Sequence, residues 1–165
     1  MTGTESTRDT IPVATETWIA TALLHREHPE RADFTIQEIV ARADAERITG
    51  QLRPGVQVHA STHCVANREP KPAQLRMLYA TGKRTRRLYR EGDEAHPKRK
   101  GPITPKPETL PAQYAYLLDW YANEYCAARR DEWLRGVIEM IGAGREVFSG
   151  VDPDEYVRGL REGWD

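Results

Sequence analysis

The sequence predicts a mainly α-helical fold with one small β-hairpin, followed by a further helical region. Apolar residues recur at helical spacing through much of the chain, and two complete helix-start signals accompany them. In the middle, two short alternating runs flank the turn TGKR at residues 81–84, which is the pattern of a hairpin. A length of 165 residues with 39% hydrophobic content suits one domain with a helical appendage.

The first predicted helix follows a polar start of the chain. Its apolar side chains form one stripe over about three turns. They are Trp18, Ile19, Ala22 and Leu23. We expect this helix to end near His28, because the residue before a proline avoids helical geometry.

The second predicted helix has an unusually complete start. Thr35 and Glu38 have the T-x-x-E spacing of a capping box, and Phe34 and Ile39 occupy the two staple positions around it. The helix is therefore expected to begin at Ile36.

A third helix is predicted from Val56 to Arg68, after the turn residues Pro54 and Gly55. Its β-branched residues would also permit a strand. The alternating runs LRMLYA and RRLYR follow, and Gly82 in the turn between them is expected to supply a positive φ.

Three helices followed by a basic hairpin are the order of elements in a winged helix-turn-helix domain, and residues 12–91 have the length of one. This part of the chain resembles such a module, including the extended pair Phe34–Thr35, which could join the hairpin as a third strand. The resemblance implies that the third helix lies in the major groove of DNA while the hairpin forms the wing.

The net charge of −1 hides a strong asymmetry along the chain. Residues 68–106 carry 12 basic and 4 acidic groups, whereas residues 107–165 carry 6 basic and 12 acidic groups. The basic middle indicates a polyanionic partner such as nucleic acid. The alternative is that the acidic end neutralises the basic middle and masks it in the free protein.

The hairpin and the third helix supply the candidate DNA-contacting residues. The hairpin has six cations and no acid between residues 76 and 90, which favours phosphate contacts over a charged edge strand that only prevents aggregation. On the third helix, Val56, Ala60 and Cys64 compete with Val58 and Val65 for the inside, so the outward face stays open. The predicted DNA-binding residues are Gln57, His59, Ser61, Thr62, His63, Asn67, Arg68, Lys83, Arg84, Arg86 and Arg87.

Residues 92–111 are predicted to be a linker, because five prolines at this density favour extended chain. The stretch also contains Lys98, Arg99 and Lys100. These side chains would either lie along a phosphate backbone as a basic arm or keep a spacer hydrated.

Residues 112–165 form the second predicted unit, an acidic helical region. A fourth helix is expected around Tyr114–Tyr125 and a fifth from Trp133, ending at Gly142–Gly144. A final helix begins at the cap Asp152. Its apolar face would either pack on the two preceding helices or bind a protein partner. The predicted partner-binding residues are Tyr156, Val157, Arg158, Leu160, Arg161 and Trp164.

The end of the chain, GAGREVFSGVDPDEYVRGLREGWD, resembles the C-terminal tail of type II antitoxins whose partner toxins are PIN-domain ribonucleases. The resemblance implies an N-terminal module that autoregulates its operon and a tail that wraps the toxin. This chain is long for that family, and its N-terminal half differs from the swapped β-barrel or ribbon-helix-helix common there.

Enzyme and metal chemistry find little support in the sequence. His59 and His63 have the i, i+4 spacing of two zinc ligands, but Ala60 stands where a hydrolytic zinc site would have a carboxylate. Cys64 and Cys126 fit no metal or redox spacing. We expect no catalytic residues, no metal and no cofactor. Without a signal peptide or an apolar run long enough to span a membrane, a cytoplasmic protein with no membrane partner is expected.

The sequence therefore predicts a bacterial DNA-binding regulator, in its sharpest form an autoregulating antitoxin. Its expected partners are double-stranded DNA and a protein bound by the C-terminal helices, which could be a PIN-domain toxin. A homodimer would raise specificity through paired half-sites. The alternatives are a protein-interaction module whose arginines meet an acidic protein, and a DNA-recognition accessory of a restriction or modification system.

Overall fold

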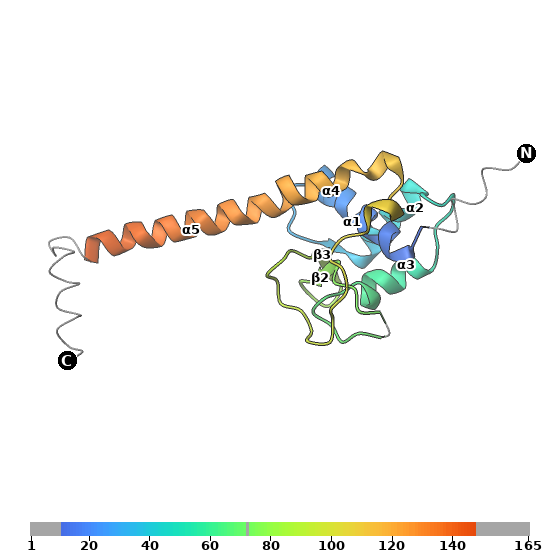
Figure 1. Cartoon of the computed structure of the whole chain (residues 1–165), viewed down its shortest axis with the longest axis horizontal. Helices are drawn as coiled ribbons and strands as arrows, with labels where there is room; N and C mark the ends of the chain where they lie inside the picture. The colour runs from blue at the N-terminus through green and yellow to red at the C-terminus, as the bar shows by residue number, and fades with distance from the viewer. Residues whose placement is uncertain (1–10, 72, 148–165) are drawn as a thin grey trace, which may run out of the picture. The chain divides into compact units, whose positions relative to one another are not determined.

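A computed structural model of the chain describes residues 11–71 and 73–147. It is mainly helical with one small antiparallel sheet, as the sequence predicts (Figure 1). The chain divides into two units, residues 1–123 and residues 124–165. The elements of the first unit up to the sheet are α1 (Val13–Glu27), β1 (Phe34–Thr35), α2 (Ile36–Glu46), α3 (Gly55–Val58), the π-helical turn η1 (His59–His63), β2 (Leu78–Ala80) and β3 (Thr85–Leu88). They are followed by η2 (Pro107–Thr109), η3 (Ala112–Tyr114), α4 (Tyr116–Trp120), η4 (Tyr121–Tyr125) and α5 (Cys126–Val147).

The sheet has the strand order β1-β3-β2, and all its pairs are antiparallel. The predicted hairpin and its third strand are both confirmed, with Phe34 opposite Arg86 and Leu78 opposite Leu88. The expectation of a positive φ at Gly82 was wrong, because only Gly50 and Gly92 adopt one among the glycines of the described chain. Gly82 instead provides space, since a Cβ there would lie 2.7 Å from the Thr85 hydroxyl.

The start of α2 follows the sequence prediction in detail. The Glu38 backbone N–H donates to the Thr35 hydroxyl at 3.1 Å, and the Thr35 N–H donates to the Glu38 carboxylate at 2.7 Å. This is a capping box, and the helix begins at Ile36 as expected. Phe34 and Ile39 on either side of it are fully buried.

Helix α1 is the centre of the first unit and is buried on all sides from Ala14 to His25. The sequence predicts only one buried stripe, but polar residues of α1 are buried too. Thr17 and Thr21 satisfy their hydroxyls locally by donating to the backbone carbonyls four residues earlier, each at 2.9 Å. The helix ends at Glu27 with His28 as its cap, where the following proline predicts an end.

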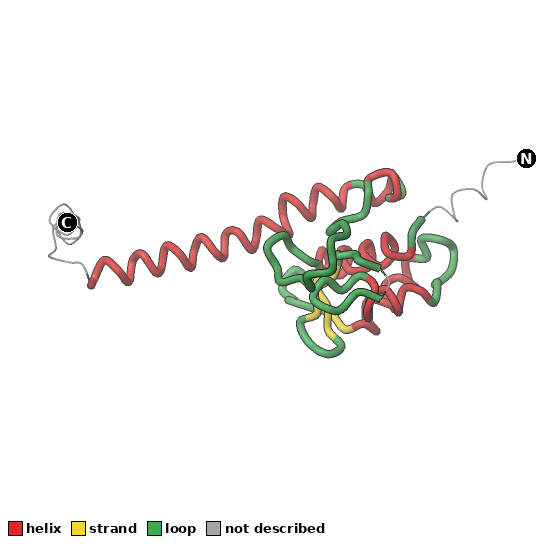
Figure 2. The backbone as a smooth tube through the Cα atoms, turned by 60° about the horizontal axis from the view of Figure 1, so that its bottom comes forward, coloured by secondary structure: helices red, strands yellow, loops and turns green. Residues whose placement is uncertain are grey.

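The structure corrects the predicted linker at residues 92–111. This segment has little regular structure, but it packs into the first unit, where Asp93, Arg99 and Leu110 are buried. Its backbone bonds to distant chain, for example from the His96 N–H to the Ala66 carbonyl at 2.8 Å. Prolines exclude helix and sheet hydrogen bonds here, yet they do not prevent packing of an irregular segment whose polar groups find partners. Figure 2 shows the loops that surround the strands of the first unit.

The chain after residue 111 also contributes to the first unit. Tyr114 and Leu117 are buried, and the Tyr114 hydroxyl donates to the Glu46 carboxylate at the end of α2. The Trp18 and Tyr121 rings meet edge to face with centroids 5.8 Å apart. The first unit therefore extends to Asn123, beyond the boundary at 91 expected for the DNA-binding domain.

The third helix is shorter than predicted. It comprises α3 and η1 and ends at His63, because the chain then turns to join the sheet. Val65 forms a bridge with Leu78, and the Ala66 N–H donates to the Leu78 carbonyl at 2.8 Å. Asn67 and Arg68, predicted on the helix, lie beyond its end.

The fourth and fifth predicted helices are not separate, since helical residues continue from Tyr116 to Val147. The predicted end at Gly142 was wrong. No proline occurs between Pro111 and Pro153, and a glycine in a helix only weakens it without requiring an end. Within the described residues, none of the helices is long and apolar enough to cross a bilayer.

Candidate nucleic-acid interface

The structure decides which side of the third helix faces outward. Val56, Ala60 and Cys64 have no exposed surface, whereas 45% of Val58 is exposed. Gln57 is exposed as well, and Ser61 and Thr62 are partly exposed. We call Gln57, Val58, Ser61 and Thr62 the presented face. It offers an amide, two hydroxyls and apolar methyl groups, which are the groups that contact base edges in the major groove.

Arg86 connects the end of this helix to the hairpin. Its guanidinium donates to the carbonyls of Ala60 at 3.0 Å and Ser61 at 3.2 Å. It also donates to the carbonyls of Gly82 at 3.1 Å and Thr85 at 2.7 Å. Burial lowers the pKa of Arg86 to about 10, and the nearby charge of Arg68 adds to this shift. The side chain is still a cation at neutral pH, but it is 1% exposed and its donors face the protein.

The tip of the hairpin, residues 81–84, is exposed and carries Lys83 and Arg84. The exposed Arg68 joins them, because its guanidinium donates to the Lys83 carbonyl at 3.4 Å. We call Arg68, Lys83 and Arg84 the tip cations. One acid lies nearby, since Asp33 accepts a hydrogen bond from Thr81 at 2.7 Å. Through Arg86, the tip cations and the presented face are held to each other.

Arg87, predicted to contact phosphate, forms an internal ion pair instead. Two of its nitrogens donate to the Asp93 carboxylate at 2.7 and 3.0 Å, and its guanidinium lies 4.3 Å from the centre of the Tyr79 ring. Because the Asp93 side chain is 2% exposed, this pair is largely removed from solvent. Arg87 therefore binds the segment after the hairpin to the sheet.

Asn67, another predicted DNA contact, also has a structural role. Its amide nitrogen donates to the Ala80 carbonyl at 3.0 Å, and its amide oxygen accepts from the Ala80 N–H at 2.8 Å. Both ends of the amide are engaged with the edge of β2. Asn67 thus completes the sheet where the chain leaves the third helix.

His59 and His63 form an edge-to-face pair with ring centroids 4.8 Å apart. The His59 Nδ1 bonds to the Gly55 carbonyl at 2.9 Å, and burial lowers the pKa of this imidazole despite the opposing effect of that hydrogen bond. Among residues 11–71 and 73–147, no three side chains of metal-ligand type come together. His59 lines a pocket described below and is not on the presented face.

Arg99 is a residue whose role the sequence does not reveal. It lies in the segment predicted as a basic arm, yet it is 3% exposed and donates to backbone carbonyls. These belong to Thr62, His63, Arg68, Glu69 and Leu75, at 2.6 to 3.4 Å. Nothing in the local sequence separates Arg99 from its exposed neighbours Lys98 and Lys100. Only the fold around it does so.

The second unit carries a different feature, an apolar stripe on α5. Large side chains that recur at helical spacing are exposed by 43 to 71%. They are Trp133, Leu134, Ile138, Met140 and Ile141. The predicted partner-binding residues Tyr156, Val157, Arg158, Leu160, Arg161 and Trp164 lie outside the described residues. In the part that is described, α5 therefore carries an exposed apolar surface.

Comparison of this chain with known protein families, with curated proteins and with solved structures found no match.

Proposed function

We propose that the first unit is a winged helix-turn-helix domain that binds duplex DNA. Support comes from the element order helix, strand, helix, helix, strand, strand, and from a sheet in which the first strand pairs with the last. In such a domain the third helix enters the major groove while the hairpin follows the backbone.

The observation that carries the proposal is the link made by Arg86 between the presented face and the tip cations. A DNA-reading surface needs base-contacting and phosphate-contacting groups at a fixed distance from each other. Arg86 bonds to both elements through four backbone carbonyls, so neither can move without breaking these bonds. Gln57 would contact an adenine edge, while Arg68, Lys83 and Arg84 would neutralise phosphates.

Fluorescence anisotropy across a salt series tests this function, with a duplex from the chain's own upstream region and a scrambled duplex. The full chain should bind both with a steep salt dependence and prefer its own region. No binding to either duplex at low salt would refute the proposal. It would leave the tip cations as a docking surface for an acidic protein.

A second function, binding of a protein partner, is supported by the exposed stripe on α5. A surface of this kind on a helix with a polar opposite side fits the apolar groove of another protein or a second copy of the helix. The antitoxin form of the proposal adds that the partner is a PIN-domain ribonuclease, as the resemblance of the chain's end suggests.

Copurification tests the antitoxin form. The full chain would be coexpressed with a PIN-domain protein encoded next to it. A stable complex that suppresses ribonuclease activity is expected. If the ribonuclease activity is unchanged, the antitoxin form of the proposal is refuted, whereas the proposal of DNA binding is not.

A further inference from the structure

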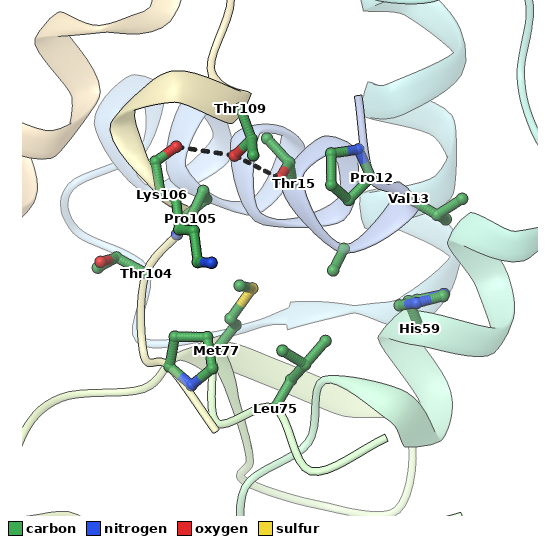
Figure 3. A pocket seen from close by; sticks show the side chains of 12 residues that line it. Pro12, Val13, Thr15, His59, Leu75, Met77, Thr104, Pro105, Lys106 and Thr109 are labelled. Carbon is green, nitrogen blue, oxygen red and sulfur yellow. Dashed lines mark hydrogen bonds between the residues drawn. The ribbon is translucent and has the colours of Figure 1, made fainter. Parts of the chain in front are cut away.

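A pocket of about 510 Å³ opens beside the start of α1. Four segments form it, namely the first turn of α1, His59, the residues that lead into β2, and the segment 102–109 (Figure 3). Leu75 and Met77 point into it from the sheet side, opposite Thr15 and Thr109. This volume lies within the range of small-molecule sites, about 300–1,000 Å³.

The walls of the pocket are mostly apolar. The apolar lining comes from Val13 and Ala14 of α1, from Leu75 and Met77 before β2, and from Pro105. Ala14, Met77 and Pro105 are buried, so these walls belong to the packed interior and not to a loose surface fold. An apolar body would lose its water here and gain contacts on several sides.

The polar groups of the pocket differ in what they can still bind. The Thr15 and Thr109 hydroxyls lie 3.3 Å apart, and Thr109 donates its proton to the Lys106 carbonyl at 2.7 Å (Figure 3). Thr15 then donates to Thr109, so both hydroxyl protons are used inside the protein. Lys106 is the single formally charged residue among those that line the pocket, and no carboxylate lines it.

His59 does not add a second charge to this set. Its Nδ1 can bond to the Gly55 carbonyl only as a donor, and burial lowers the pKa of the ring. At neutral pH the imidazole is therefore uncharged, with Nε2 as an acceptor. The net electrostatic preference of the pocket is for one negative charge, set by Lys106.

We propose that this pocket binds small carboxylic acids with an apolar body. The apolar body lies between Met77 and Ala14, and the carboxylate contacts Lys106. The site is assigned from its walls and charge and does not depend on DNA binding. Because His59 belongs to the helical segment that also bears the presented face, an occupant would contact that segment directly.

Methionine methyl NMR on the full chain tests the site, since the sequence has only Met1, Met77 and Met140. Met77 lines the pocket, whereas Met140 is 71% exposed on α5 and serves as an internal control. Met77→Leu and Met140→Leu assign the signals. The probes are benzoate, benzyl alcohol and benzylamine, which share a ring and differ in charge.

Benzoate should shift the Met77 signal in a saturable way, and benzylamine should bind about tenfold more weakly or not at all. The Met140 signal should stay in place. Lys106→Gln should weaken benzoate binding about fivefold or more and leave benzyl alcohol binding unchanged. The matched variant Lys100→Gln, which removes an exposed charge outside the pocket, should have no effect.

Three results would overturn the proposal. The Met77 signal could remain unmoved by benzoate up to about 10 mM, a concentration that detects even weak ligands. Met77 and Met140 could respond alike, which would indicate nonspecific binding. Benzylamine could bind as tightly as benzoate, which would remove the role given to Lys106.

Discussion

Arg86 and Arg99 cap the same helix end, and between them they bind four consecutive carbonyls. Arg86 takes those of Ala60 and Ser61, and Arg99 takes those of Thr62 and His63. The last four carbonyls of a helix have no partner within it. Two cations at this end also complement the helix dipole. The helix with the presented face is thus held at its end by Arg86 of the hairpin and by Arg99 of segment 92–111.

Loss of the Arg99 cap should destabilise the first unit. Arg99→Met keeps most of the side-chain volume but removes the guanidinium donor from several partly buried carbonyls, such as those of His63 and Leu75, each loss costing about 1–3 kcal/mol. We expect the free energy of unfolding, measured by urea denaturation of the full chain, to fall by about 3 kcal/mol or more. Lys100→Met, at the exposed neighbour, should change it by about 0.5 kcal/mol or less. Equal effects of the two variants would mean that Arg99 does not cap the helix.

Substitution of the tip cations should weaken DNA binding through electrostatics alone. Lys83→Ala with Arg84→Ala should lower the salt slope of binding by about 2, because each lost phosphate contact reduces it by about 0.9. Arg130→Ala with Arg135→Ala removes the same charge from the second unit and is the matched control. Salt titrations by anisotropy measure both. An unchanged slope in the tip variant would place the phosphate contacts elsewhere.

Arg86 should act on DNA binding by positioning and not by contact. Arg86→Lys keeps the positive charge but loses the fork that reaches four carbonyls. We expect weaker preference for the chain's own upstream region with an unchanged salt slope. A slope that falls as it does in the tip variant would show that Arg86 touches phosphate after all.

Val58 should contact a thymine methyl group. Its exposure on the presented face has no packing purpose in the free chain, and a methyl contact would bury it in the major groove. Once a preferred duplex is known, Val58→Ala and replacement of the thymine by deoxyuridine should each weaken binding about fourfold, because one of the two Val58 methyl groups contacts the single thymine methyl group and each change removes that contact. The two changes together should weaken binding no more than either change alone. Additive losses would show that the two groups do not meet.

His25 should make the first unit less stable in acid. Burial lowers its pKa to about 3, with further lowering by the charges of Arg90, Arg87 and Arg31. The unfolded chain binds a proton near pH 6.5 and the folded chain does not. This contribution to stability is therefore complete above pH 6.5 and is lost as the pH falls toward 3, at about 1.4 kcal/mol per pH unit.

Urea denaturation of the full chain at pH 7, 6 and 5 measures this effect. In His25→Gln, the free energy of unfolding should depend less steeply on pH, by the equivalent of about one bound proton. His28→Gln, at an exposed site, should keep the wild-type slope. The same slope in wild type and His25→Gln would contradict a buried neutral His25.

The capping box at Thr35 and Glu38 and the hairpin around TGKR are predictable from the sequence because their bonds join residues close in the chain. The bonded residues of the capping box are three positions apart in the sequence, and those of the hairpin turn are four positions apart. The third strand was expected from the resemblance to a winged helix-turn-helix domain and not from local spacing, because Phe34 pairs with Arg86 in the distant hairpin.

The roles of the arginines were decided by tertiary structure. From the sequence alone, Arg86, Arg87 and Arg99 cannot be distinguished from Lys83 and Arg84, because all are basic residues in polar surroundings. Arg99 reaches carbonyls up to 37 residues away and Arg86 reaches one 26 residues away. Such partners are backbone groups, which every residue type carries, so no pattern of side chains marks them in advance.

The same reason explains segment 92–111 and the outward face of the third helix. Composition determined that the proline-rich segment has little regular structure, but not that it packs, because its backbone is satisfied by distant groups such as Ala66 and Arg76. Helical spacing placed Val56 and Val58 on competing ridges. Tertiary packing decided between them, because α3 lies against α1 and α2, with Val56 buried and Val58 left exposed.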